Sequence, residues 1–254
     1  MNKNRFNFGI IMIMAIQVIN TEMTLSPMHI HMHENKSSFC EAHSICFKEG
    51  KSKGKIGYMA GERFLELFSQ VNLSESLWLN INILLCEYRR KNMCNWIFGE
   101  NEPLHSRLPK EVFGEMSISL LDRVSIYTKS KKIENTNMAT EQHAFICDYR
   151  PMNWSGNTTR LELFHSKSIQ IHGTHALPDK TAGCFHNEHN VSLTWCAFRC
   201  HRDYACRSFY YNRISLECIH TKYVDSLMAR KDWIRKPSAW IRFARTKWSL
   251  AAEL

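Results

Sequence analysis

Four closely spaced cysteines are the residues of this chain whose chemistry is most restricted by their spacing. Three residues separate Cys196 from Cys200, five separate Cys200 from Cys206, and eleven separate Cys206 from Cys218. Two helical residues four positions apart share a face, so the sulfurs of Cys196 and Cys200 can point at one neighbouring layer. The pairings of least strain are then 200 with 206 and 196 with 218, which would fasten a helix to a sheet. The alternative is a zinc site, but the spacing lacks the paired short knuckles of common structural zinc sites.

The ten cysteines favour an oxidising compartment, where thiols form disulfides, because in the cytosol most of them would remain unpaired thiols. They fall into two groups of five, Cys40, Cys46, Cys86, Cys94, Cys147 and then Cys184, Cys196, Cys200, Cys206, Cys218. Since each group is odd in number, Cys184 is expected to join Cys40 or Cys46, or to bridge to a second chain in a disulfide-linked dimer.

The N-terminus predicts secretion. Residues 1–20 combine a short basic start with the apolar run Phe8 to Ile19, which suits a signal peptide and is too short to span a bilayer. A buried N-terminal helix or strand is the alternative. Outside this run no segment reaches the length of a membrane span. Five N-x-S/T sequons add to the expectation of a secreted, extracellular glycoprotein: Asn35, Asn72, Asn153, Asn157 and Asn190.

Composition shifts along the chain predict its division. The proline, the glycine and two sequons of residues 151–160 are typical of an exposed linker. A polar tract precedes the first cysteine and is expected to be a flexible arm. We therefore predict a signal peptide at 1–20, a flexible arm at 21–38, domains at 39–150 and 161–246, and a glycosylated linker at 151–160.

Periodicity indicates α+β structure in both domains. In the first, residues 61–71 carry an amphipathic helical stripe, residues 77–85 alternate as a strand does, and residues 144–149 form a short apolar strand. In the second, Ser192 is a plausible N-cap for a helix whose buried face holds Leu193, Cys196, Ala197 and Cys200. Strands are expected at 206–211, 217–220 and 239–245.

The run from Ser192 to Cys200, followed by Cys206-Arg-Ser-Phe209-Tyr-Tyr211 and Glu217-Cys218, resembles the pattern of a PAN/Apple domain. Ile171-His-Gly173 is similar to the first strand and turn of that family. The resemblance covers about residues 161 to 245 and implies a helix cradled by a five-stranded sheet, with a role in binding proteins or carbohydrates. The chain departs from the Apple variant because no cysteine follows Cys218.

Residues 39–150 resemble a C-type lectin-like domain in the order of a helix, the Trp78 segment, Cys94-Asn-Trp96 and the terminal Phe145-Ile-Cys147-Asp. Two of the usual internal cysteines are absent. The family's calcium signatures are absent too: Glu102-Pro103 is followed by leucine, and no W-N-D motif occurs. Calcium needs six or more oxygens held together, so calcium-dependent sugar binding is not expected.

A net charge of +9 points to anionic partners, which outside the cell are sulfated glycans and acidic glycoproteins rather than nucleic acid. Basic residues interleaved with aromatic ones near the C-terminus could pair with sulfate or carboxylate while the rings stack on sugars. The alternative is a strand with core aromatics and solvated arginines. The candidate ligand-binding residues are Arg230, Lys231, Arg235, Lys236, Trp240, Arg242 and Arg245.

Other chemistry is weakly indicated. The alternating His29, His31 and His33 could hold zinc or copper, but fortuitous spacing in a flexible arm is the favoured interpretation. Common nucleophile, zinc-protease and phosphate-loop motifs are absent from the sequence. We therefore predict no catalytic residue, metal or cofactor, and a secreted recognition protein for glycans or protein surfaces. The alternatives are a matrix component assembled through inter-chain disulfides and a divergent enzyme.

Overall fold

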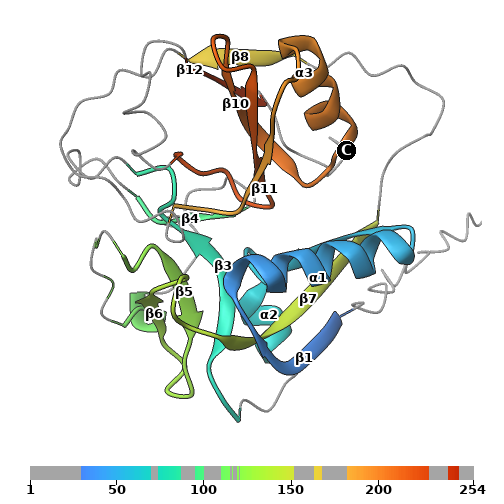
Figure 1. Cartoon of the computed structure of the whole chain (residues 1–254). Coiled ribbons are helices and arrows are strands. Elements are labelled where there is room, and N and C mark those ends of the chain that lie inside the picture. The colour runs from blue at the N-terminus through green and yellow to red at the C-terminus, as the bar shows by residue number, and fades with distance from the viewer. Residues whose placement is uncertain are drawn as a thin grey trace, which may run out of the picture.

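The computed structural model describes residues 30–69, 74–86, 95–99, 110–114, 116, 119, 121–151, 163–167, 182–228 and 240–245. Within them the chain forms two sheets with a helix fastened against each, which confirms the predicted disulfide-stapled α+β class (Figure 1). The predicted signal peptide, most of the linker and the segment Ile171 to Gly173 lie outside the described residues.

The first sheet is built around β7 (His143–Pro151), which confirms the apolar strand expected at 144–149. Its main strand order is β1-β7-β3-β5-β6, with β2 also paired to β7 and β4 to β3. All pairs are antiparallel except β3 with β7. The remaining strands are β1 (Ile30–Ser37), β2 (Lys55–Met59), β3 (Leu77–Asn82), β4 (Ile97–Phe98), β5 (Val124–Tyr127) and β6 (Ile133–Thr136), and a 3-10 turn, η3, spans Lys110–Val112.

Strand β3 lies between two helices. The predicted alternation holds for its apolar side, because Leu77, Leu79 and Ile81 join the core that contains α2 (Phe64–Phe68). Its other side is buried as well: Trp78 packs edge-on against Phe39 of α1 (Phe39–Ser52), and its indole donates to the Ser37 carbonyl. Both faces of β3 are therefore covered. The helix predicted at 61–71 is shorter in the structure, where α2 ends at Phe68 and begins at Phe64.

Helix α1 is not among the predicted elements, although the sequence carries its start signal. Ser38-Phe-Cys-Glu41 is an S-x-x-E capping pattern, and the Ser38 hydroxyl accepts from the Glu41 amide at 3.4 Å. The helix lies directly on β2. A Cβ atom at Gly57 would fall 1.8 Å from the Cys46 carbonyl oxygen, and one at Gly50 would fall 2.1 Å from the Gly57 nitrogen. Glycine at both positions therefore sets the distance between helix and strand.

The flexible arm predicted at 21–38 is wrong for Ile30–Ser37, which form β1. This segment pairs with β7 from Ile30 opposite Asp148 to His33 opposite Phe145. The polar composition of this segment predicts an arm, but polar side chains are also compatible with an edge strand. One side of its hydrogen-bond ladder and much of one face stay in solvent.

The second sheet is fully antiparallel, in the order β8-β12-β10-β11-β9. Its strands are β8 (Phe164–Lys167), β9 (Phe185–Glu188), β10 (Cys206–Asn212), β11 (Glu217–Lys222) and β12 (Trp240–Arg245), and α3 (Leu193–Arg202) lies on one face. As predicted, Ser192 caps the helix, its hydroxyl accepting from the Trp195 amide at 3.1 Å. The three strands expected in this half are present; β8 and β9 are additional.

The two halves share a core. Tyr223 and Val224, which follow β11, pack with residues of α1 and with Trp78, and the Tyr223 ring stacks on His43. The Cys40–Cys184 disulfide joins the first turn of α1 to the residue before β9. In Figure 1 α1 accordingly lies on the side of the lower lobe that faces the upper one.

Candidate functional site

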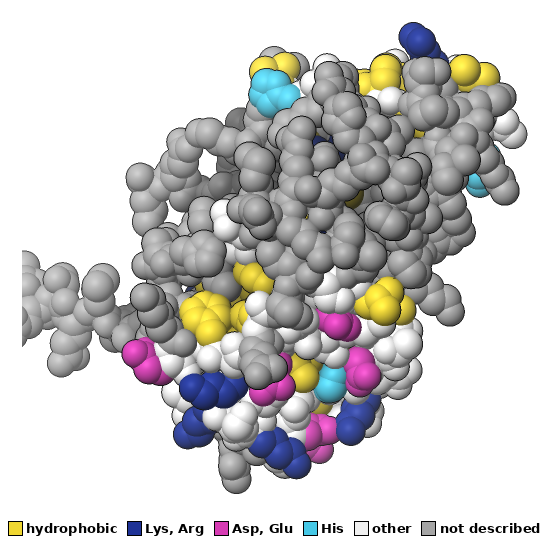
Figure 2. Space-filling model, turned by 90° about the vertical axis from the view of Figure 1, so that its left-hand side faces the viewer, with side chains coloured by type: hydrophobic (Ala, Val, Ile, Leu, Met, Phe, Trp, Pro, Cys, Tyr) yellow, Lys and Arg dark blue, Asp and Glu magenta, His cyan; other side chains and the backbone are white. Residues whose placement is uncertain are grey.

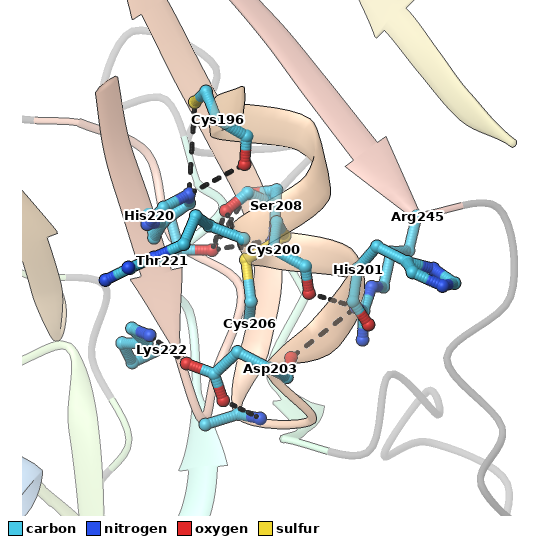
Figure 3. Close-up of a disulfide and its surroundings, with 12 residues drawn as sticks. Cys196, Cys200, His201, Asp203, Cys206, Ser208, His220, Thr221, Lys222 and Arg245 are labelled. Carbon is cyan, nitrogen blue, oxygen red and sulfur yellow. Dashed lines mark hydrogen bonds and ion pairs between the residues drawn. A yellow bond between two sulfur atoms is a disulfide. The ribbon is translucent and has the colours of Figure 1, made fainter. Parts of the chain in front are cut away.

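The inner face of α3 is fastened to the second sheet by the two bridges predicted from helical spacing. Cys196 is joined to Cys218 on β11, and Cys200 to Cys206 at the start of β10. Both helical cysteines are fully buried. Figure 3 shows the bridge from Cys200 to Cys206. Because these sulfurs are bonded to each other, the neighbouring group Cys196, Cys218 and His220 cannot supply the thiolates of a zinc site.

His220 forms the polar link beneath the helix. Its Nε2 donates to the Cys196 carbonyl at 3.0 Å (Figure 3). Its Nδ1 lies 3.7 Å from the Glu188 carboxylate. Burial lowers the pKa of His220, which outweighs the opposite effect of this hydrogen bond. The neutral ring is therefore a structural element of the module.

Other cysteines complete the framework. The prediction that Cys184 joins Cys40 or Cys46 is confirmed for Cys40, so this thiol is not available for a bridge to a second chain. Cys46 is joined to Cys147 on β7, a pairing the sequence did not indicate. Cys86 is disulfide-bonded as well. Of the ten cysteines only Cys94 lies outside the described residues.

The predicted ligand-binding stretch near the C-terminus is only partly described. Arg230, Lys231, Arg235 and Lys236 lie outside the described residues. Trp240 is buried against Tyr210 and Ile219 on the face of the second sheet away from α3.

The assignment of Arg242 to ligand binding is corrected by the structure. Its side chain is buried on the same face as Trp240, and its guanidinium is paired with the Asp225 carboxylate. A buried arginine that has a carboxylate partner cannot turn outward without leaving that charge unpaired.

The assignment of Arg245 is corrected too. Its guanidinium donates to the Cys200 carbonyl and, at 3.2 Å, to the His201 carbonyl at the end of α3 (Figure 3). The Cys200 carbonyl also accepts from the amide of the C-cap residue Asp203, so Arg245 adds a side-chain cap to the end of the helix. The alternation of β12 thus directs both arginines into the fold, toward opposite faces of its sheet.

The outer face of α3 presents aromatic side chains to solvent. Trp195 and Phe198 are 46% and 43% exposed, and their ring centroids lie 5.6 Å apart. Leu193, expected on the buried face, is also exposed. We call Leu193, Trp195, Phe198, Arg199 and Arg202 the α3 outer face.

Exposed apolar side chains concentrate around this face. Of seven large hydrophobic side chains that are exposed in the described residues, five lie on α3 or on the turn between β10 and β11, where Ile214 and Leu216 stand. The turn is tied to the start of the helix because the Val191 amide donates to the Leu216 carbonyl at 3.1 Å. Such a concentration on one module is the usual mark of an interaction surface.

Basic groups border the aromatic pair. The Arg199 guanidinium lies 5.9 Å from the Trp195 ring and the Arg202 guanidinium 5.6 Å from the Phe198 ring. Arg199 also pairs with Glu188 at 3.3 Å, which fixes its position. The helix has no acid in its first turn and three basic residues in its last. The α3 outer face thus combines aromatic rings with positive charge.

The first half has a different surface. On the side drawn in Figure 2, basic and acidic side chains are interspersed over the described surface of the lower lobe, and no single sign dominates there. A field that mixes both signs gives little electrostatic attraction for a polyanion.

Two of the five predicted glycosylation sites are described, and both are exposed: Asn35 on β1 and Asn190 before α3. Asn72, Asn153 and Asn157 lie outside the described residues. None of the helices in the described part of the chain has the length and hydropathy that a membrane crossing requires.

A second group of polar side chains lies where β1 meets α1. His31, His33 and Glu49 bring their ligand-type atoms within 4.8 Å of one another. Burial raises the pKa of Glu49, but hydrogen bonds from Tyr149 and His31 outweigh this effect and lower the pKa to about 2. Burial lowers the pKa of His33. The sequence placed these histidines on one side of an extended chain, but the partner carboxylate on α1 could not be found without the fold.

No protein-family model and no curated sequence matches the chain. Among solved structures it is similar to the EPNH mutant of CEL-I, with 9% identity, a TM-score of 0.33, and 47% of this chain and 87% of that chain covered. It is also similar to the carbohydrate-recognition domain of the mouse scavenger receptor C-type lectin, with 12% identity, a TM-score of 0.34, and 48% and 89% covered. Likenesses of this size do not show a shared function.

Proposed function

We propose that the protein is a secreted, non-enzymatic recognition protein that binds acidic or sulfated glycans through the α3 outer face. The observation that carries this proposal is the exposed pair Trp195 and Phe198 beside Arg202 on a helix whose inner face is already fastened. Aromatic rings can stack on sugar rings while guanidinium groups pair with sulfate or carboxylate.

A purely structural explanation accounts for only part of this surface. Basic residues in the last turn favour the helix dipole, so Arg199 and Arg202 could be present for stability alone. That explanation leaves out Trp195 and Phe198. Two disulfides already attach α3 to its sheet, and exposed rings add little to the attachment. Exposed aromatic residues beside positive charge favour a ligand that has both ring faces and acidic groups.

The fold assignments belong to the same proposal. A five-stranded antiparallel sheet with α3 fastened by two bridges supports the PAN/Apple-like interpretation of residues 161–246. The C-type lectin-like interpretation of residues 39–150 rests on the order of sequence features. Secretion is supported by nine disulfide-bonded cysteines and by the exposure of Asn35 and Asn190. A matrix component joined by inter-chain disulfides is less favoured, since none of the described cysteines is free.

Retention of the secreted chain on a column of sulfated glycan, eluted with salt, tests the proposed surface. We expect Arg202→Glu and Trp195→Ala each to elute at lower salt than wild type, with a shallower salt dependence for Arg202→Glu because one ionic contact is lost. The matched control is Lys129→Glu, which makes the same charge change on an exposed residue of the first half and should leave retention unchanged.

Two outcomes would contradict this site. Equal loss in Lys129→Glu and Arg202→Glu would mean that net charge alone drives retention. The second outcome is that Lys236→Glu weakens retention while Arg202→Glu and Trp195→Ala are retained as strongly as wild type. The ligand would then bind the basic stretch predicted at Arg230, Lys231, Arg235 and Lys236.

A further inference from the structure

The pair β1 and β7 places two imidazoles over the first sheet on the side of α1. His31 and His33 are two residues apart on β1, so both side chains point to the same side of the strand. His31 stands opposite Cys147 and His33 opposite Phe145, on whose ring the His33 ring stacks at 4.5 Å. These contacts hold His33 in one orientation.

Helix α1 brings a carboxylate to the same place. The Cys46–Cys147 disulfide fastens the helix over β7, and the close approach of Gly50 to Gly57 fixes it over β2. Glu49 lies between these two attachment points on α1. Its carboxylate is therefore positioned by a covalent bond and a backbone contact rather than by a mobile loop.

The distances fit the edges of a tetrahedral site. Oε2 of Glu49 lies 3.0 Å from Nδ1 of His31, and Oε1 lies 3.3 Å from Nε2 of His33. Ligand atoms bound about 2.0–2.1 Å from a tetrahedral zinc ion stand roughly 3.3 Å from one another. The ligand atoms of the two imidazoles also lie within 4.8 Å of each other. Small side-chain rotations would suffice to place all three atoms around one ion.

Two further features point to a ligand at this place. Nε2 of His33 is buried and faces the Glu49 carboxylate without a well-aligned hydrogen bond to it. The Tyr149 hydroxyl donates to Oε2 of Glu49, so that a second residue of β7 orients the carboxylate from behind. Outer-shell hydrogen bonds of this kind are characteristic of metal sites.

The site is open on one side, because the His31 side chain is 52% exposed. A fourth position could therefore be taken by water. One cation competes for the carboxylate: Nζ of Lys53 lies 4.0 Å from Glu49 and 3.8 Å above the Tyr149 ring. At that distance and in partly exposed surroundings, the lysine charge lowers the affinity of the site for a metal ion. The lysine nitrogen does not occupy the position of the ion.

We propose that His31, His33 and Glu49 form a binding site for a divalent transition-metal ion, Zn²⁺ foremost. Two imidazoles and one carboxylate suit zinc, whereas calcium and magnesium prefer a shell of oxygens. The site lies in the first half of the chain and its occupancy does not depend on glycan binding at α3.

Titration of the metal-stripped, disulfide-intact chain with Co²⁺, followed by competition with Zn²⁺, tests the site. We expect the visible absorption of tetrahedral Co²⁺ in wild type, its displacement by one equivalent of Zn²⁺, and its loss in His31→Gln and Glu49→Gln. Tyr149→Phe should keep the spectrum and bind roughly 10-fold more weakly, as a residue that only orients a ligand does.

The chain has thirteen histidines, so incidental metal binding needs a matched control. His189→Gln serves, because His189 is exposed and pairs with Glu217 at 3.2 Å in the second half. It should leave the Co²⁺ spectrum unchanged. His31→Gln changes an exposed side chain, so its loss of binding does not depend on misfolding. A Co²⁺ spectrum retained in both His31→Gln and Glu49→Gln, or lost equally in His189→Gln, would overturn the proposal, as would preferential binding of Ca²⁺.

Discussion

Helices α1 and α3 are both fastened by two disulfides, yet of the two only α3 presents large hydrophobic side chains to solvent. The cysteines of α1 bond in two directions, Cys46 to β7 of its own sheet and Cys40 to Cys184 of the other half. Both cysteines of α3 bond to strands of one sheet. Six helical residues turn through 600°, which leaves the two sulfurs of α1 about 120° apart, whereas four residues leave those of α3 about 40° apart.

The difference in spacing determines what each helix can do. With attachments in two directions, α1 packs against its own sheet and against Tyr223 of the other half, and the ring of His43 is buried. The side chains that α1 leaves exposed are polar. With attachments on one side, α3 has an opposite face that the fold does not use, and there Trp195 and Phe198 stand in solvent. The first helix joins the two halves, whereas the second leaves its outer face in solvent.

Removing the staple of α3 should have the largest effect on stability. We expect the double variant Cys196→Ser/Cys218→Ser to lose about 2–5 kcal/mol in the free energy of unfolding, because a core this small depends on its bridge. Denaturant unfolding of the disulfide-intact chain measures this loss. The matched variant Cys40→Ser/Cys184→Ser should lose less, since the shared core around Trp78 and Val224 still holds the two halves together. Equal losses would remove the distinction between the two helices.

Acid should weaken the contact between the halves through His43. Burial lowers the pKa of this histidine from 6.5 to about 3 in the folded chain. As the pH falls below 6.5 the unfolded chain binds the proton first, so stability is lost down to pH 3 at about 1.4 kcal/mol per pH unit. The melting temperature between pH 7 and 4.5 should fall less steeply for His43→Phe than for wild type, while His189→Gln should match wild type. Parallel curves for all three would contradict the buried state of His43.

The smallest effect on stability is expected on the α3 outer face. Trp195→Ser and Phe198→Ser should each change the free energy of unfolding by no more than about 0.5 kcal/mol, as exposed substitutions do. Phe39→Ala on α1 is the contrasting change and should cost about 3–5 kcal/mol, because Phe39 is fully buried. Thermal denaturation compares the three variants. A loss of several kcal/mol in Trp195→Ser would assign that ring to the core.

The sequence predicts the second half better than the first because its signals are local. Ser192 and the spacing of Cys196 and Cys200 specify a capped helix and its bridges without further knowledge. Helix α1 has local signals too, a capping pattern at Ser38 and buried residues at helical spacing. Its position depends instead on Gly50 meeting Gly57, a contact between two elements. Composition therefore could not reveal it.

The candidate sites show the same limit. Basic and aromatic composition near the C-terminus predicted ligand contacts for Arg242 and Arg245, but strand register and the positions of Asp225 and the end of α3 decide where these side chains point. The amphipathic spacing predicts that Leu193 lies on the buried face of its helix, but its side chain is exposed. Such spacing cannot distinguish an apolar residue that packs against the sheet from one on a partly apolar exposed face. The pairing of β1 histidines with Glu49 likewise needs the fold.

Nuclear magnetic resonance of the isotope-labelled chain with a sulfated oligosaccharide tests the central claim most directly. The signal of the Trp195 indole, identified with Trp195→Phe, and the amides of α3 should shift in a saturable way. The buried indoles of Trp78 and Trp240 should keep their positions. Saturable shifts that leave Trp195 and α3 unmoved and appear on the first half or on residues 230–236 would contradict α3 as the recognition surface.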